Sequence, residues 1–133
     1  MKSYNLHISH RPGRDGSIPA NPHVPFYLAM ECSVEAWNSL LVSTCGDLLS
    51  AGDLGVVDVS AQFTRELFVG DVRAEASLIR LGVSSVSFRV VIYQEEMAGA
   101  DITIVLARLA DGRTRSTPLS PEQRAALETI LEK

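Results

Sequence analysis

The sequence has no excess of positive charge and no long apolar run, and both absences limit what the protein can contact. Its 133 residues include 12 lysines and arginines against 16 aspartates and glutamates, a formal net charge of -4. Nucleic-acid binding needs clustered basic side chains, so nucleic acid is not expected as a partner. No apolar run approaches the roughly 18 residues of a membrane span, and the N-terminus lacks the apolar core of an export signal. We therefore expect a cytoplasmic protein without membrane contact.

Cysteine and aromatic residues are also scarce. Cys32 and Cys45 fall in one expected helix. At ~1.5 Å per residue they lie roughly 20 Å apart, whereas disulfide-bonded Cα atoms lie within about 7 Å, so we expect two free thiols. Aromatic residues make up 6% of a chain that is 46% hydrophobic, which predicts an interior of valine, leucine and alanine. The length suits a single domain over residues 1–133.

Several catalytic and cofactor motifs are missing. The chain has no Gly-x-Ser-x-Gly elbow and no glycine-rich loop leading from a strand into a helix. This argues against a serine hydrolase and against a dinucleotide-binding protein. His7 and His10 point to opposite faces of an expected strand, and no cysteine or acidic residue completes a ligand set. We expect no metal site.

One long apolar helix precedes a run of strands. Pro25 suits the first turn of a helix, and no further proline interrupts the mostly apolar stretch that ends at Leu49. Alternation of apolar and polar residues predicts strands at 4–10, 57–64, 72–79, 84–94 and 100–109. A helix of this length can hide its apolar surface only if a sheet curls around it. The order therefore predicts an α+β fold in which an antiparallel meander wraps around the helix.

Turn and loop residues separate these elements. A long loop rich in proline and glycine occupies residues 11–22, Gly70-Asp71 and Asp111-Gly112 read as tight turns, and Ser120 is placed to cap a last helix. Long loops in small domains often carry function, so the loop before the helix is a candidate site.

Three parts of the chain follow a family pattern. They are Arg11–Gly16 with His23–Tyr27, then Phe63–Asp71 with Ile79–Phe88, and finally Arg115–Pro121. Together they resemble the hotdog-fold acyl-CoA thioesterases of the 4-hydroxybenzoyl-CoA thioesterase type. The resemblance implies the hotdog fold and hydrolysis of a small or medium acyl-CoA, aromatic acyl groups included. Coenzyme A would then be part of the substrate, with no separate cofactor. It also implies a homodimer or homotetramer whose sites form where two sheets join.

The resemblance carries catalytic roles to particular residues. Thioester hydrolysis needs a carboxylate and a donor for the oxyanion. In the family the carboxylate comes from the loop before the helix, which matches Asp15, and the donor is a backbone N–H at the helix start, which matches Val24. Asp15 also suits a simple turn in Arg-Asp-Gly.

Two further residues are catalytic candidates. Some hotdog thioesterases take their carboxylate from the central helix, which makes Glu31 the second choice, although Glu31, Glu35 and Asn38 form a stripe typical of a solvated or subunit-facing edge. His23 could bind the substrate carbonyl or orient Asp15, or it could serve as a cap or loop contact.

The resemblance also suggests substrate contacts. Tyr27 would lie beside the acyl tunnel, and Ser84 and Ser85 beside the pantetheine arm, although serines near turns also cap strands. Arginine side chains favour phosphates because of their forked donors, so the candidates for contact with the nucleotide phosphates are Arg80, Arg89, Arg113 and Arg115. Each of them could equally be an ordinary surface charge.

Two alternative functions stay open. Asn21-Pro22-His23 resembles the Asn-Pro-x-His motif of hotdog enoyl-CoA hydratases with one residue missing. A non-catalytic acyl-CoA-binding protein on the same scaffold is the other alternative, because a fold does not establish chemistry.

Overall fold

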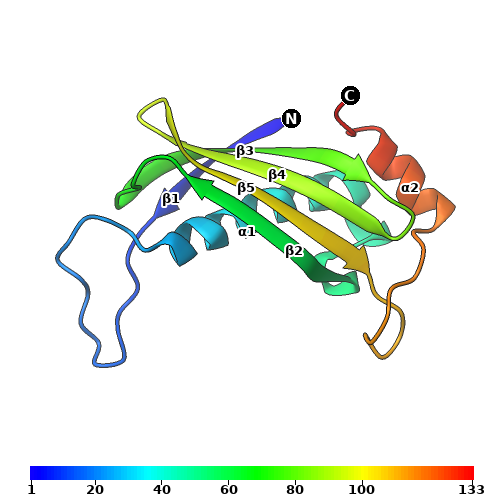
Figure 1. The fold of residues 1–133 in the computed structure, drawn as a ribbon, viewed down its shortest axis with the longest axis horizontal. Coiled ribbons are helices and arrows are strands. Elements are labelled where there is room, and N and C mark those ends of the chain that lie inside the picture. Colours follow the sequence, from blue (N-terminus) through cyan, green and yellow to red (C-terminus); the bar gives the residue numbers. More distant parts are fainter.

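A five-stranded antiparallel sheet curves around one long helix in the computed structural model, which describes residues 1–133 (Figure 1). In chain order the elements are β1 (Lys2–Ile8), α1 (Phe26–Cys45), β2 (Leu54–Phe63), β3 (Gly70–Leu81), β4 (Ser85–Gln94), β5 (Met97–Arg108) and α2 (Pro121–Glu128). Short 3-10 turns at Gly46–Leu48 and Ala51–Asp53 join α1 to β2. The expected α+β architecture, a sheet wrapped around one helix, is confirmed. None of the helices has the length and apolarity needed to span a membrane.

The strand order is β1-β3-β4-β5-β2, and it corrects the expected meander. Only β3, β4 and β5 are consecutive neighbours; β2 pairs with β5, and β1 pairs with β3. The link from β2 to β3 therefore crosses from one edge of the sheet to the far side of β4. Gly70-Asp71 is the start of β3 and not a turn between paired strands. Alternation showed where the strands lie, but it carries no information on which strands pair.

The helix α1 is shorter than expected at both ends. Pro25 is its N-cap with an extended backbone, so the first helical residue is Phe26. Gly46 takes a φ of 55°, a left-handed conformation that suits glycine, and α1 ends at Cys45 and not at Leu49. Its buried face lies on the sheet, where Trp37 stacks on Phe88 with ring centroids 5.6 Å apart.

The core lies between α1 and the concave face of the sheet. The alternation expected on β3, β4 and β5 is confirmed, because their inward residues are buried: Val72, Ala74, Ala76, Leu78, Val86, Phe88, Val90, Ile92, Ala100, Ile102, Ile104 and Leu106. Each fully buried valine, leucine or isoleucine contributes about 1.5–3 kcal/mol relative to exposure. Both cysteines are buried free thiols, as expected.

The edge strand β2 is the least buried strand. Leu54 is its one buried residue, whereas Val56 and Val57 are 62% and 64% exposed, and Val59 and Phe63 are also exposed. Its outer backbone groups have no neighbouring strand. An apolar, unpaired edge of this length is unusual for an isolated chain.

The C-terminal segment covers the end of the sheet that lies away from the start of α1. Asp111-Gly112 forms a turn as expected, but the returning chain makes only one bridge, between Leu109 and Ser116, and no strand. Ser120 caps α2 as expected, in a capping box with Gln123. Gln123 also donates to the Leu48 carbonyl at 2.8 Å, which ties α2 to the end of α1.

Candidate active site

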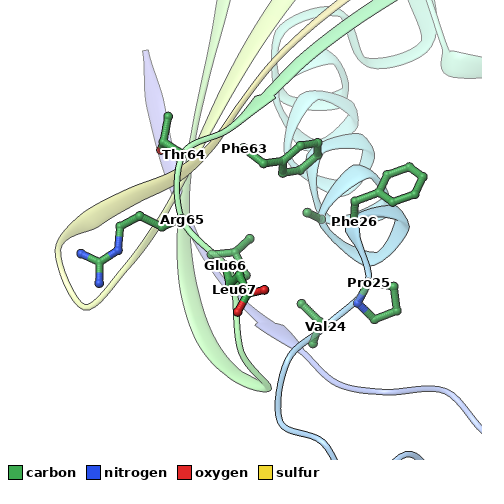
Figure 2. A pocket seen from close by; sticks show the side chains of 9 residues that line it. Val24, Pro25, Phe26, Phe63, Thr64, Arg65, Glu66 and Leu67 are labelled. Carbon is green, nitrogen blue, oxygen red and sulfur yellow. The ribbon is translucent and has the colours of Figure 1, made fainter.

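A cavity of about 300 Å³ lies between the N-terminus of α1 and the segment that leaves β2 (Figure 2). The side chains around it are mostly apolar. It is lined by Val24, Pro25, Phe26, Ala29, Phe63, Thr64, Arg65, Glu66 and Leu67. Figure 2 shows Phe63 beside Phe26, and the two rings are edge-on with centroids 6.2 Å apart. A pocket with apolar walls and a few polar groups is the usual form of a small-molecule site.

A short backbone pairing places the start of α1 against the β2–β3 link. The Val24 N–H donates to the Leu67 carbonyl at 3.0 Å, and the Val69 N–H donates to the Pro22 carbonyl at 2.9 Å. Between these two bonds, His23 and Phe68 form an isolated antiparallel bridge. Two segments far apart in sequence therefore form the walls of one cavity.

The first N–H groups of α1 have no protein acceptor. Pro25 has no N–H, and the N–H groups of Phe26 and Tyr27 make no hydrogen bond, whereas Leu28 donates to the Pro25 carbonyl at 3.1 Å. The expected donor, Val24, is occupied by its bond to Leu67. The N–H of Phe26 is therefore the free donor that belongs to a cavity-lining residue.

Asp15 lies away from the cavity, on the long loop that projects from the body of the protein (Figure 1). Its carboxylate accepts the Ser17 hydroxyl at 2.6 Å and the Ser17 N–H at 3.0 Å. These two hydrogen bonds, the hydroxyl first, lower the pKa of Asp15. The geometry is that of a turn residue, the second of the two interpretations drawn from the sequence.

Glu31 is also outside the cavity. Its carboxylate forms an ion pair with the Arg11 guanidinium, and both line a separate hollow of about 60 Å³ between β1 and α1. Glu35 lines the same hollow. This pair ties the long loop to the outer face of α1, and it leaves no carboxylate of the helix at the cavity.

The expected substrate contacts are scattered. Tyr27 is exposed at the rim, edge-on to Phe26 at 6.2 Å. Ser84, Ser85 and Arg80 lie at the β3–β4 turn, at the end of the sheet opposite the cavity (Figure 1). The carbonyls of Ser84 and Ser85 accept backbone N–H groups there, as expected of turn residues.

The remaining arginines divide into two groups. Arg89 forms a two-pronged pair with Asp101 at 2.9 and 2.6 Å, which lowers the pKa of Asp101. Arg113 donates to the carbonyls of Gly52 and Leu54 at 2.5 and 3.2 Å, and Arg115 lies exposed in the same turn. Within one chain, none of the four candidate arginines lines the cavity.

His23 and Glu66 meet beside the cavity. Nδ1 of His23 lies 2.5 Å from Oε2 of Glu66, an ion-pair distance, although the two groups are not aligned as a hydrogen bond. The His23 ring packs on Phe68 with centroids 4.6 Å apart. Sequence reasoning selected His23 but missed Glu66, which lies in the irregular link between two strands. Neither here nor in the rest of the structure do three His, Cys, Asp or Glu side chains lie close enough together to hold a metal ion.

Comparison with known proteins places this geometry in a family. The structure is similar to a thioesterase from Thermus thermophilus solved with coenzyme A and Zn (TM-score 0.77, 20% identity, 94% of this chain and 91% of that chain). It is also similar to a 1,4-dihydroxy-2-naphthoyl-CoA thioesterase from Synechocystis (TM-score 0.75, 18% identity, 94% of this chain and 93% of that chain). A predicted thioesterase from Bacillus stearothermophilus is a third similar structure (TM-score 0.77, 16% identity, 99% of this chain and 98% of that chain). The TM-scores show a shared fold, and at these identities the likeness establishes the fold alone.

No curated protein matches the sequence. The family model of the thioesterase superfamily matches residues 29–100, more than half of the chain. With the sheet wrapped around α1, this match shows that the chain is a hotdog-fold protein and belongs to the thioesterase superfamily.

Proposed function

We propose that the protein hydrolyses acyl-CoA thioesters. One observation carries the proposal: an apolar cavity opens at the free N–H groups of the α1 N-terminus, in a chain of the thioesterase superfamily. The N-terminus of a helix favours negative charge, because its first N–H groups are unpaired and the helix dipole is positive there. The developing oxyanion of a thioester carbonyl is such a charge.

The proposed reaction adds water to the carbonyl carbon. The Phe26 N–H donates to the carbonyl oxygen while a carboxylate accepts the proton of the attacking water. The tetrahedral intermediate then collapses, the carbon–sulfur bond breaks, and the products are a carboxylic acid and the free thiol of coenzyme A.

The cavity dimensions favour a small or medium acyl group. A volume of about 300 Å³ is at the lower end of the range for ligand sites. Phe26 and Phe63 provide aromatic faces on its walls, which suit an aromatic or short aliphatic acyl chain.

We further propose that the active form is at least a homodimer joined through β2. Two copies of this edge, paired antiparallel about a two-fold axis, satisfy each other's backbone groups and cover Val57 and Val59. The cavity lies at the Phe63 end of β2, whereas the turn containing Arg113 contacts the Leu54 end. Antiparallel pairing brings these two ends together across the interface, so the arginines that lie far from the cavity in one chain approach the cavity of the other.

Free-thiol release from a panel of aromatic and aliphatic acyl-CoAs tests the proposal. We expect release from at least one short or aromatic substrate, with saturation kinetics. Tight binding of acyl-CoA without thiol release from any member would contradict hydrolysis and favour the acyl-CoA-binding alternative. Hydration of an enoyl-CoA without thiol release would favour the hydratase.

A further inference from the structure

Glu66 is the one carboxylate among the residues that line the cavity. Its side chain is 73% exposed, so water and substrate can reach it. Figure 2 shows its oxygens turned toward Val24 at the start of α1, while the Arg65 side chain points away from the cavity. Arg65 contacts the sulfur of Met97 instead. The Arg65 guanidinium therefore does not form an ion pair with the Glu66 carboxylate.

His23 is held in place against Glu66. The His23 N–H donates to Oδ1 of Asn21 at 2.9 Å, the bridge to Phe68 fixes its backbone, and its ring packs on the Phe68 ring. Its Nδ1 is buried and has no hydrogen-bond partner other than the nearby Glu66 carboxylate. The imidazole is therefore placed to hold the carboxylate at the cavity.

The competing carboxylates are occupied elsewhere. Asp15 is bonded twice by Ser17, and Glu31 is paired with Arg11 in a different hollow. Neither contacts the cavity that contains the free helix N–H groups. A general base must lie within hydrogen-bond reach of the water it activates, and Glu66 is the only carboxylate that lines the cavity.

We propose that Glu66 is the general base of the hydrolysis and that His23 is its positioning residue; this inference rests on the proposed function. The Glu66 carboxylate takes one proton from water as the water oxygen bonds to the thioester carbonyl carbon. The carbonyl π electrons move to the oxygen, where the Phe26 N–H donates to the resulting anion. The anion then re-forms the carbonyl, the carbon–sulfur bond breaks, and the proton on Glu66 passes to the sulfur of coenzyme A.

The test compares Glu66→Gln with a matched control in steady-state thiol release. His7 and Asp71 form the same kind of pair, with Nδ1 of His7 2.9 Å from Oδ1 of Asp71, but Asp71 does not line this cavity. Asp71→Asn therefore removes an exposed, histidine-paired carboxylate without touching the proposed base. We expect Glu66→Gln to lower kcat by about 10²–10⁴-fold with little change in KM, and Asp71→Asn to leave kcat unchanged.

Two further variants separate catalysis from folding. Glu66→Asp keeps the carboxylate, so it should recover part of the kcat that Glu66→Gln loses. If Glu66 had a purely structural role, glutamine would fill that role as well and kcat would not fall in Glu66→Gln. His23→Asn should lower kcat less than Glu66→Gln does. It should also displace the acidic limb of the pH profile of kcat, and Glu66→Gln should abolish that limb. Thermal unfolding of each variant confirms that the fold is intact.

The outcomes distinguish this inference from the proposed function. An active parent whose Glu66→Gln variant keeps its kcat would overturn the role of Glu66 and leave hydrolysis standing. If Asp15→Asn or Glu31→Gln abolished thiol release while Glu66→Gln stayed active, the role of Glu66 would also be overturned and the other carboxylate would be identified as the base. A parent that releases no thiol from any substrate would overturn both.

Discussion

A histidine–carboxylate pair lies near one end of each edge strand of the sheet, and the surroundings of the two pairs differ. At the β1 edge, His7 and Asp71 face open solvent, and Asp71 is 95% exposed. Beyond the Phe63 end of β2, His23 and Glu66 border an apolar cavity and the free N–H groups of α1. The same pair of groups can act on a substrate in one place and not in the other, because catalysis also needs a binding wall and an oxyanion donor.

The edges also differ in how they are covered. On β1, Tyr4, Leu6 and Ile8 turn toward the core, so the apolar side chains of this strand are covered within one chain. On β2, valines on both faces stay exposed. This contrast is the reason we propose β2 as the edge that pairs with a second copy.

The largest predicted effect comes from placing a charge on the β2 edge. Val59→Lys should convert the dimer to a monomer and remove most thiol release, because the lysine would be buried at the interface and the cavity would lose its second wall. Sedimentation equilibrium and the thiol assay measure both effects. Asn5→Lys on the exposed face of β1 is the control and should change neither. A dimeric, active Val59→Lys variant would refute pairing through β2.

The next effect comes from removing the proposed oxyanion donor. Phe26→Pro deletes the N–H at the first helical position, where proline is well tolerated, and Pro25 already has the extended backbone (φ -63°, ψ 152°) that precedes proline. Phe26→Ala removes the ring alone. We expect kcat of the proline variant to fall about 10²–10³-fold below that of the alanine variant. Equal kcat values would show that another group stabilises the oxyanion.

A smaller effect is expected for the carboxylates outside the cavity. Asp15→Asn removes the acceptor of two Ser17 bonds on an exposed loop, and Glu31→Gln weakens a surface ion pair that contributes at most about 1 kcal/mol. Both variants should keep the parent kcat in the thiol assay. A drop of the size expected for Glu66→Gln in either one would move the base away from the β2 side.

The smallest effect concerns the β1 edge. The Tyr4 hydroxyl is buried, and burial raises the pKa of Tyr4 above its ordinary value of 10.0, which outweighs the opposite effect of the nearby Ser43 hydroxyl. The folded state therefore holds the phenolic proton more tightly than the unfolded state. The resulting stability is present below pH ~10 and is lost as the pH rises through the folded-state pKa. Unfolding in urea at pH ~8 and above pH ~10 should show this loss in the parent and not in Tyr4→Phe.

The sequence predicted local structure better than it predicted contacts. Buried alternation identified β3 and β4, and Ser120 identified the start of α2, because these signals are carried by neighbouring residues. The break between β4 and β5 was expected over 95–99 and is a tighter turn at Glu95-Glu96, whose φ values of 53° and 62° occur without the usual glycine or asparagine. Strand order escaped because β2 pairs across the sheet with β5.

The candidate site was only partly predictable. The helix start, with His23 and the general place of the proposed oxyanion donor, followed from Pro25 and the family pattern. Glu66 has no local signal: it reaches the helix start only because Val24 and Leu67 pair across a long stretch of chain. Asp15 matched the family order along the sequence, but the loop folds back on Ser17 and carries it away from the cavity.

We propose that the thioester carbonyl lies between the Phe26 N–H and the Glu66 carboxylate. A crystal structure with an acyl-CoA analogue in which CH₂ replaces the thioester sulfur tests it most directly, because the analogue keeps the carbonyl but cannot be hydrolysed. We expect the carbonyl oxygen about 3 Å from the Phe26 nitrogen, with Glu66 facing the carbonyl carbon through one water. An acyl group seated in the hollow beside Arg11 and Glu31, or a carbonyl turned away from the start of α1, would contradict it.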